Sequence, residues 1–129
     1  MAMMKGAAAA NPDAYVEALS GWQRERVKML RAAVNAGGDF QETIKWTNLV
    51  FILNGPCIVI RAEESRVLLA LFRGKRLTQF DPRIKPSGKF ELANLVMVEE
   101  NEVDPAMITQ LAAAAAALNL EYGDPTARR

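Results

Sequence analysis

The sequence predicts one α+β domain: a central antiparallel sheet of about five strands, with helices from both ends of the chain packed on one face. Two observations lead to this prediction. Helix-start signals and helical periodicity occur before residue 38 and again after residue 104, whereas residues 43–98 contain β-branched and aromatic runs divided by turn residues. The chain has 129 residues, of which 50% are hydrophobic and 24% charged, which is enough for one buried core.

The N-terminal part predicts two successive helices. Asn11 stands before Pro12, which is the combination of an N-cap and a proline at the first helical position. Ser20, with Gln23 three residues later, predicts a capping box at the start of a second helix. The glycine pair at residues 37–38 predicts where that helix ends.

The middle of the chain predicts an antiparallel meander. A first extended run at residues 43–53 is broken near Thr47, and further runs follow at residues 57–62 and 67–72. The Asn-Gly pair at residues 54–55 is the strongest short hairpin signal in the chain. Because the runs lack clean alternation, we expect central strands that are covered on part of both faces.

The remaining segment predicts a loop, a strand and a long helix. We expect residues 74–91 to be a loop with one short helical turn near Asp81, and the apolar run that begins at Leu92 to be the last strand. Asp104 before a proline predicts an N-cap for a helix that ends near Leu120. We therefore divide the chain into a disordered leader, one domain and a flexible tail, at residues 1–10, 11–120 and 121–129.

Composition narrows the classes of function. The chain has no histidine, which excludes Ser-His and Cys-His nucleophile pairs and favours a role that is not enzymatic. Cys57 is the only cysteine, so an intramolecular disulfide is excluded and a cytoplasmic location is favoured. The net charge of +1 provides no overall field for nucleic acid, and no segment approaches the roughly 20 apolar residues of a membrane span.

The segment at residues 42–46 is a candidate ligand-binding site. In an extended strand Glu42, Ile44 and Trp46 share one face, whereas Lys45 lies on the other. One interpretation places Ile44 and Trp46 in the core and leaves Lys45 at the surface. The other interpretation places Glu42, Lys45 and Trp46 around a pocket for an anionic or polar small ligand. The residues alone leave both open.

Several segments together resemble a known family. The E-x-I-K-W segment at residues 42–46, the turn at residues 54–55, the loop QFDPRIKPSGK and the Asp-Pro helix start are similar to those of the YdhG-like proteins, a bacterial family called domain of unknown function 1801. The resemblance covers residues 11–119. It implies an α+β fold similar to frataxin. It also implies activity as an intracellular iron chaperone, which binds iron and delivers it to an acceptor protein.

Two features depart from the pattern of this family. The family has a glycine and a proline between the tryptophan and the next phenylalanine, whereas this chain has residues 47–50 between Trp46 and Phe51, with neither. A frataxin-like iron surface uses acids on the first helix and the sheet edge, because iron in such a setting prefers oxygen ligands. Here the first two helices contribute only three acids, Asp13, Glu17 and Glu25.

Carboxylates are the candidate metal ligands. The residues that we expect to hold weakly bound iron are Glu17 on the first helix, and Glu99 and Glu100 after the last strand. The alternative for Glu99 and Glu100 is that they belong to a solvated turn between strand and helix.

Two further binding modes follow from the charge and hydropathy patterns. Basic and aromatic side chains alternate in residues 72–89, as in proteins that bind single-stranded nucleic acid, but the near-neutral charge and the missing RNA-binding signature argue against it. The uninterrupted apolar strands favour a homodimer interface. The sequence therefore predicts a non-catalytic, iron-chaperone-like binding domain. The alternatives are a small-ligand or enzyme-like pocket around Lys45 and Trp46, and a homodimerising domain.

Overall fold

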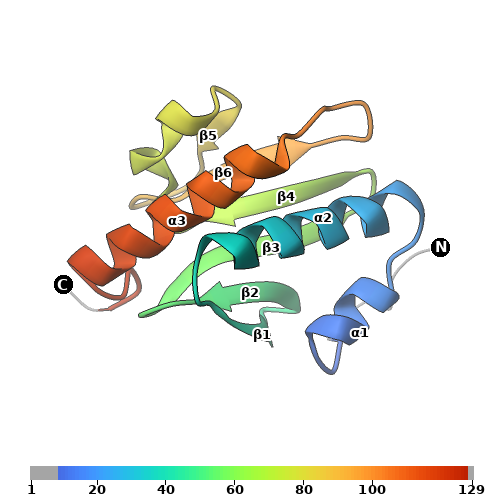
Figure 1. Cartoon of the computed structure of the whole chain (residues 1–129), viewed down its shortest axis with the longest axis horizontal. Helices are drawn as coiled ribbons and strands as arrows, with labels where there is room; N and C mark the ends of the chain where they lie inside the picture. Colours follow the sequence, from blue (N-terminus) through green and yellow to red (C-terminus); the bar gives the residue numbers. More distant parts are fainter. Residues whose placement is uncertain (1–8, 128–129) are drawn as a thin grey trace.

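The structure is a computed structural model that describes residues 9–127, and Figure 1 shows its two layers, with helices in front of a sheet. Residues 1–8 of the predicted leader and residues 128–129 of the predicted tail lie outside the described residues. Within the described part, six strands form one antiparallel sheet in the order β1-β2-β3-β4-β6-β5, and helices α2 and α3 cross one of its faces. The predicted fold class is confirmed.

The strands run antiparallel throughout. Their bounds are Gln41–Lys45 for β1, Asn48–Ile52 for β2, Pro56–Glu63 for β3, Arg66–Leu71 for β4, Ile84–Pro86 for β5 and Ala93–Met97 for β6. Asn54 and Gly55 have positive φ angles in the β2–β3 turn, as the hairpin signal predicts.

Strand β5 lies within the segment that was predicted to be a loop. It forms because Ile84 is buried in the core and pairs with Leu95 of β6. The short helical turn expected near Asp81 is present as the 3-10 helix Thr78–Phe80, and a first 3-10 helix, Gly74–Arg76, precedes it.

All three helices begin directly after the capping residue that the sequence predicts. They span Pro12–Glu17 for α1, Gly21–Gly37 for α2 and Pro105–Tyr122 for α3. The Asn11 side chain accepts a hydrogen bond of 2.8 Å from the backbone N–H of Ala14, and Asp104 caps α3 in the same way. The predicted capping box of α2 is wrong: within residues 9–127 the Ser20 side chain caps no backbone N–H. Gln23 instead donates to the backbone oxygens of Glu63 and Arg66 in the β3–β4 turn.

Helices α2 and α3 pack closely because small residues face each other. A Cβ atom on Gly37 would stand 3.0 Å from that of Ala112, and the Thr109 hydroxyl donates a hydrogen bond of 2.8 Å to the Ala33 oxygen. The small side chain of Ala112 therefore allows α3 to approach α2 closely. None of the helices in the described part is long and apolar enough to span a membrane.

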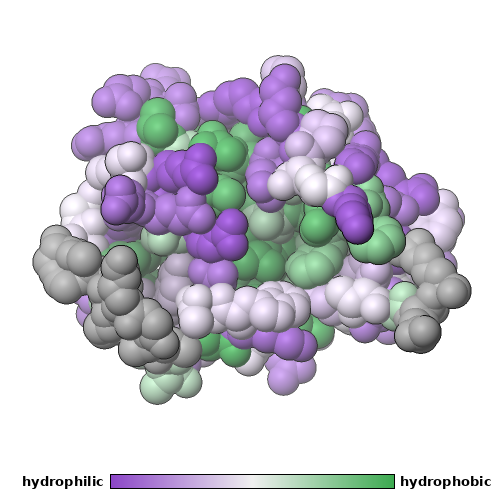
Figure 2. All heavy atoms as spheres, turned by 180° about the vertical axis from the view of Figure 1, so that it is seen from behind, coloured by the Kyte–Doolittle hydropathy of each residue, from purple (hydrophilic) through white to green (hydrophobic). Residues whose placement is uncertain are grey.

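Within residues 9–127, no helix crosses the other face of the sheet. Strand alternation places Val50, Val59 and Leu68 on this face, outside the cluster that lies between the sheet and the helices, and all three side chains are buried. Figure 2 shows the molecule from this side, with hydrophobic side chains in the hollow centre and hydrophilic side chains around them. Phe72 directly follows β4 and, four residues after Leu68, has the same orientation as Leu68 in the alternation of the strand. It lines a pocket.

Candidate functional site

A pocket of about 460 Å³ lies where three segments of the chain meet. These segments follow β4, precede β6 and follow α3. Most of its lining is apolar, from Phe72, Phe90, Leu92, Pro125 and Ala127. The volume falls within the range of about 300–1,000 Å³ that is usual for small-molecule sites.

One aromatic side chain of the pocket is strongly exposed. Phe90 is 73% exposed and has a φ angle of 59°, in the left-handed region that residues with a Cβ atom seldom adopt. An exposed aromatic side chain on an unfavourable backbone conformation is more frequent at binding sites than elsewhere.

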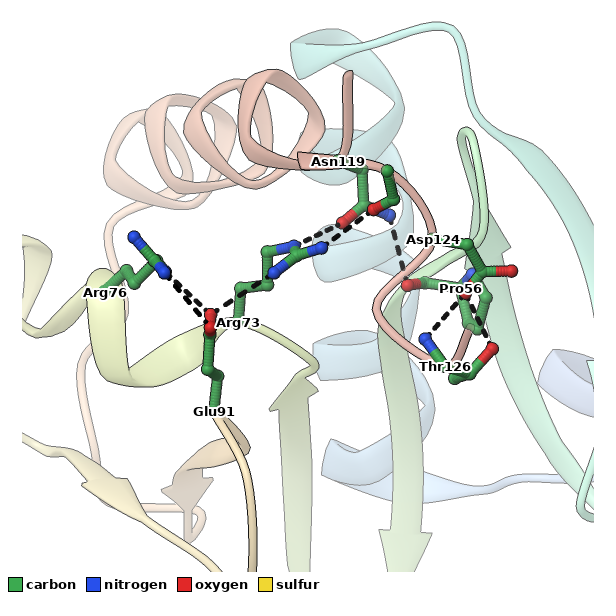
Figure 3. A network of polar contacts seen from close by, with 8 residues as sticks. Pro56, Arg73, Arg76, Glu91, Asn119, Asp124 and Thr126 are labelled. Atoms are coloured by element: carbon green, nitrogen blue, oxygen red, sulfur yellow. Dashed lines mark hydrogen bonds and ion pairs between the residues drawn. The ribbon is translucent and has the colours of Figure 1, made fainter. Parts of the chain in front are cut away.

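A buried polar network fixes the position of the pocket, and Figure 3 shows it from close by. The side chain of Arg73 lines the pocket and is only 5% exposed. Its Nε–H donates to Asn119 Oδ1 at 3.2 Å, and its second terminal nitrogen donates to the Gly123 oxygen at 2.8 Å. These bonds hold the end of α3, and with it the segment at residues 124–127, against the end of β4.

Asn119 is the centre of this network. Its side chain is fully buried, and its Nδ2 donates to three backbone oxygens of the β2–β3 turn, those of Leu53, Gly55 and Pro56, at 3.1–3.2 Å. Asn54 returns a hydrogen bond of 2.8 Å to the Asn119 backbone oxygen. The amide therefore joins α3, β4 and the β2–β3 turn.

A second set of charges adjoins the pocket. Glu91 lines it and accepts hydrogen bonds of 2.7 Å and 3.2 Å from Arg76, while Arg73 approaches the same carboxylate at 3.4 Å (Figure 3). The pKa of the Glu91 carboxyl lies below its ordinary value, first because of the hydrogen bonds from Arg76. Two guanidinium groups and one carboxylate leave a charge of +1 beside the pocket.

The tip of the β1–β2 hairpin lies next to the pocket. Trp46 and Thr47 form a two-residue turn with φ angles of 53° and 61°. The Trp46 ring is 53% exposed, its centroid lies 6.0 Å from that of Phe72, and Lys45 Nζ lies 5.1 Å from its centre. Trp46 thus contacts the pocket-lining residue Phe72, and Lys45 contacts Trp46, but neither is itself among the lining residues.

The interpretation that placed Trp46 in the core is wrong. Strand β1 ends at Lys45, so the alternation of the strand does not reach Trp46. A two-residue hairpin turn with both residues at positive φ follows, and it directs this side chain outward. Ile44, which remains in the strand, does pack against the core.

Glu42 is engaged in a structural ion pair. Its two oxygens accept hydrogen bonds of 2.7 Å each from Arg31 of α2, and Asn35 adds a third at 2.8 Å. The pKa of the Glu42 carboxyl is lowered, first because of the hydrogen bonds from Arg31. The structure therefore separates Glu42, on the helical side, from Lys45 and Trp46.

The predicted metal ligands do not come together. Glu17 forms an exposed ion pair of 2.7 Å with Arg24, whereas Glu99 and Glu100 are exposed in the turn after β6. Between residues 9 and 127 the structure contains no group of three or more His, Cys, Asp or Glu side chains that is arranged to hold a metal ion.

Sequence reasoning did not identify Asn119 or Phe90 as site residues, and it included Arg73 only in the basic and aromatic segment at residues 72–89. Asn119 carries the clearest signal, because it is a lone amide after a run of alanines in a helix. A polar residue on the apolar face of a helix is usually buried with partners, and here it has four. The hydrogen-bond partners of Asn119 lie 46 or more residues away in the sequence, so no local sequence pattern identifies them.

Comparisons with known proteins support the fold. No protein-family model matches the chain, and no curated protein matches it. Among solved structures, the chain is similar to a protein of the DUF1801 family, YdhG from Bacillus subtilis, with a TM-score of 0.65 and 13% identity. The match covers 87% of this chain and 93% of the YdhG chain. At this identity the likeness establishes a shared fold.

Proposed function

We propose that this chain is a non-catalytic binding domain and that its ligand is a small molecule that occupies the pocket beside Phe72 and Phe90. The observation that carries the proposal is an apolar pocket of about 460 Å³ with a buried arginine in its wall. Apolar surface with a few fixed polar groups is the usual composition of a small-molecule site.

The ionisable groups near the pocket favour binding over catalysis. The Glu91 carboxylate already accepts hydrogen bonds from Arg76, and Arg73 donates to Asn119 and Gly123. Burial raises the pKa of the Cys57 thiol to about 12, which keeps this group protonated and unreactive at neutral pH.

The hairpin tip supports a role in recognition. A bulky residue or a β-branched residue at positive φ costs on the order of 1–3 kcal/mol. Trp46 and Thr47 both have this conformation, and the Trp46 ring remains half exposed beside Phe72. The cost is consistent with a Trp46 side chain that is held in place for contact with a ligand.

Binding of the neutral fluorescent probe N-phenylnaphthylamine tests the proposal. In a Trp22→Phe background, Trp46 is the only tryptophan, so binding beside Phe72 should quench its emission and enhance that of the probe. Phe90→Ala should weaken binding at least several-fold. Leu120→Ala, which removes an equally exposed apolar side chain outside the pocket, is the matched control. Absence of probe binding to the folded protein would overturn the proposal.

We also propose that the chain is a distant relative of the DUF1801 proteins. The shared fold with YdhG and the E-x-I-K-W segment at residues 42–46 support this relationship. Iron carriage to an acceptor protein, which the resemblance implies, is then the second candidate function. Calorimetric titration with Fe(II) tests it, and a variant that carries Glu99→Gln and Glu100→Gln should bind less iron. Equal heats for the two proteins would refute a role for these acids.

A further inference from the structure

We infer that the pocket selects a small aromatic anion, whose ring contacts Phe72 and Phe90 and whose negative charge is attracted by the cluster of Arg73, Glu91 and Arg76. This inference rests on the proposed function and adds the chemical class of the ligand. The pairing of an apolar cavity with a net positive rim carries it.

The apolar half of the site suits a flat ring. Phe72 contributes an aromatic side chain on one side, and Phe90 contributes a second that is largely exposed. Aromatic rings prefer offset or edge-to-face partners at centroid distances of about 4.5–7 Å. Trp46 already stands at 6.0 Å from Phe72, so the aromatic surface extends beyond the lining itself.

The charged half of the site has an excess of donors. The Glu91 carboxylate is the only anion of the cluster, and Arg76 binds both of its oxygens. The Arg76 side chain is 44% exposed and has five N–H groups, of which its hydrogen bonds to Glu91 use only part. An acceptor on the ligand can therefore bind without displacing Glu91.

The neighbouring charges do not cancel this excess. Asp124 is the nearby acid, and the pKa of its carboxyl is lowered, first because Thr126 hydrogen-bonds it and in smaller part because Lys45 and Arg73 lie near. Lys45 offsets the charge of Asp124, so the sum over these two residues and the cluster remains +1.

Two probes with the same ring system isolate the effect of the charge. Anilinonaphthalene sulfonate carries a sulfonate, and N-phenylnaphthylamine lacks it. We expect the sulfonate probe to bind several-fold more tightly at low ionic strength. This preference should shrink at about 1 M NaCl, where the Debye length is ~3 Å. Equal affinities at low salt would overturn the inference and leave the proposed binding function intact. Binding of neither probe would overturn both.

Two variants change the cluster by one charge in opposite directions. Glu91→Gln raises its charge from +1 to about +2 and should tighten binding of the sulfonate probe by about fivefold. Arg76→Gln lowers it to about zero and should weaken binding by a similar factor. The affinity of the neutral probe should be the same for both variants as for the unmodified chain. Parallel changes in both probes would show that the variants alter the shape of the pocket rather than its charge, and would overturn the inference.

A competitor distinguishes a small anion from a nucleic acid on the same surface. Unlabelled naphthalene sulfonate should displace the sulfonate probe, and single-stranded oligothymidylate should not. Stronger displacement by the oligonucleotide would assign the aromatic and basic surface to single-stranded nucleic acid and would overturn the small-ligand inference.

Discussion

The Nε–H group of Arg73 donates a hydrogen bond of 3.2 Å to the Oδ1 atom of Asn119 inside the protein. The two residues are 46 positions apart, and the contact joins the end of β4 to the last turns of α3. The Nδ2 group of the same Asn119 amide donates hydrogen bonds to the backbone oxygens of the β2–β3 turn. The pocket depends on this contact because its C-terminal wall is the segment that follows α3.

Replacement of this amide should destabilise the fold strongly. Asn119→Ala removes the donor of three buried backbone oxygens and the acceptor of Arg73. We expect the free energy of unfolding to fall by about 3 kcal/mol, because buried polar groups lose their partners. Urea denaturation measures the change. Gln110→Ala, at an exposed position of the same helix, is the control. A similar change in both variants would show that the network contributes no net stability.

The ion pair between Arg31 and Glu42 should make stability depend on pH. The folded-state pKa of Glu42 is lowered from its ordinary value of 4.5. Its contribution is therefore complete above pH 4.5 and is lost as the pH falls through the lower folded-state value. At neutral pH, Glu42→Gln should reduce the free energy of unfolding by about 1 kcal/mol, and this difference from the unmodified chain should shrink below pH 4.5.

Glu17→Gln is the matched control for this ion pair. Its partner Arg24 lies at a similar distance of 2.7 Å, but the Glu17 side chain is 75% exposed. Exposed ion pairs contribute little, so the variant should have nearly unchanged stability at every pH. A pH-independent difference for Glu42→Gln would mean that packing, rather than charge, accounts for its effect.

The turn at the tip of the β1–β2 hairpin should tolerate glycine. Thr47 has a φ angle of 61°, which is unfavourable for a β-branched residue. Thr47→Gly should therefore stabilise the protein by about 1 kcal/mol in thermal or urea unfolding. Thr43→Gly, at an extended position of β1, should destabilise it by a similar amount. Loss of stability in both variants would contradict the conformational cost assigned to Thr47.

The thiol of Cys57 should be inert in the folded protein. Cys57 is buried, and burial raises its pKa to about 12. Reaction with an aromatic disulfide reagent should therefore be slow in buffer and fast in denaturing urea. A Ser65→Cys variant adds an exposed thiol in the β3–β4 turn. One equivalent of the reagent should react rapidly with the added thiol, and a second should react slowly with Cys57. Rapid reaction of both would show that the core around Cys57 opens readily.

Features that depend on neighbouring residues were predicted from the sequence. Asn11 and Asp104 cap helices because each side chain reaches a backbone N–H two or three residues away. The turn with Asn54 and Gly55 forms because these residues adopt positive φ angles readily. Local chemistry determines all of these features.

Features that depend on distant residues were missed or misjudged. The Gln23 side chain does not form the predicted capping box and donates instead to a turn about 40 residues away. Strand β5 forms because it pairs with β6. The same reason applies to the candidate site. One of the two interpretations of the sequence placed Glu42, Lys45 and Trp46 around a pocket. Trp46 lies beside the pocket residue Phe72, but the lining residues come from segments that no local pattern connects.

Asn119 also has a consequence for how the protein folds during synthesis. The ribosome produces a chain from its N-terminus, so all six strands emerge before the part of α3 that carries this amide. Until then the backbone oxygens at residues 53, 55 and 56 and the guanidinium of Arg73 lack their hydrogen bonds to this amide. The hydrogen bonds that join β4, the β2–β3 turn and α3 can therefore form only after Asn119 has left the exit tunnel.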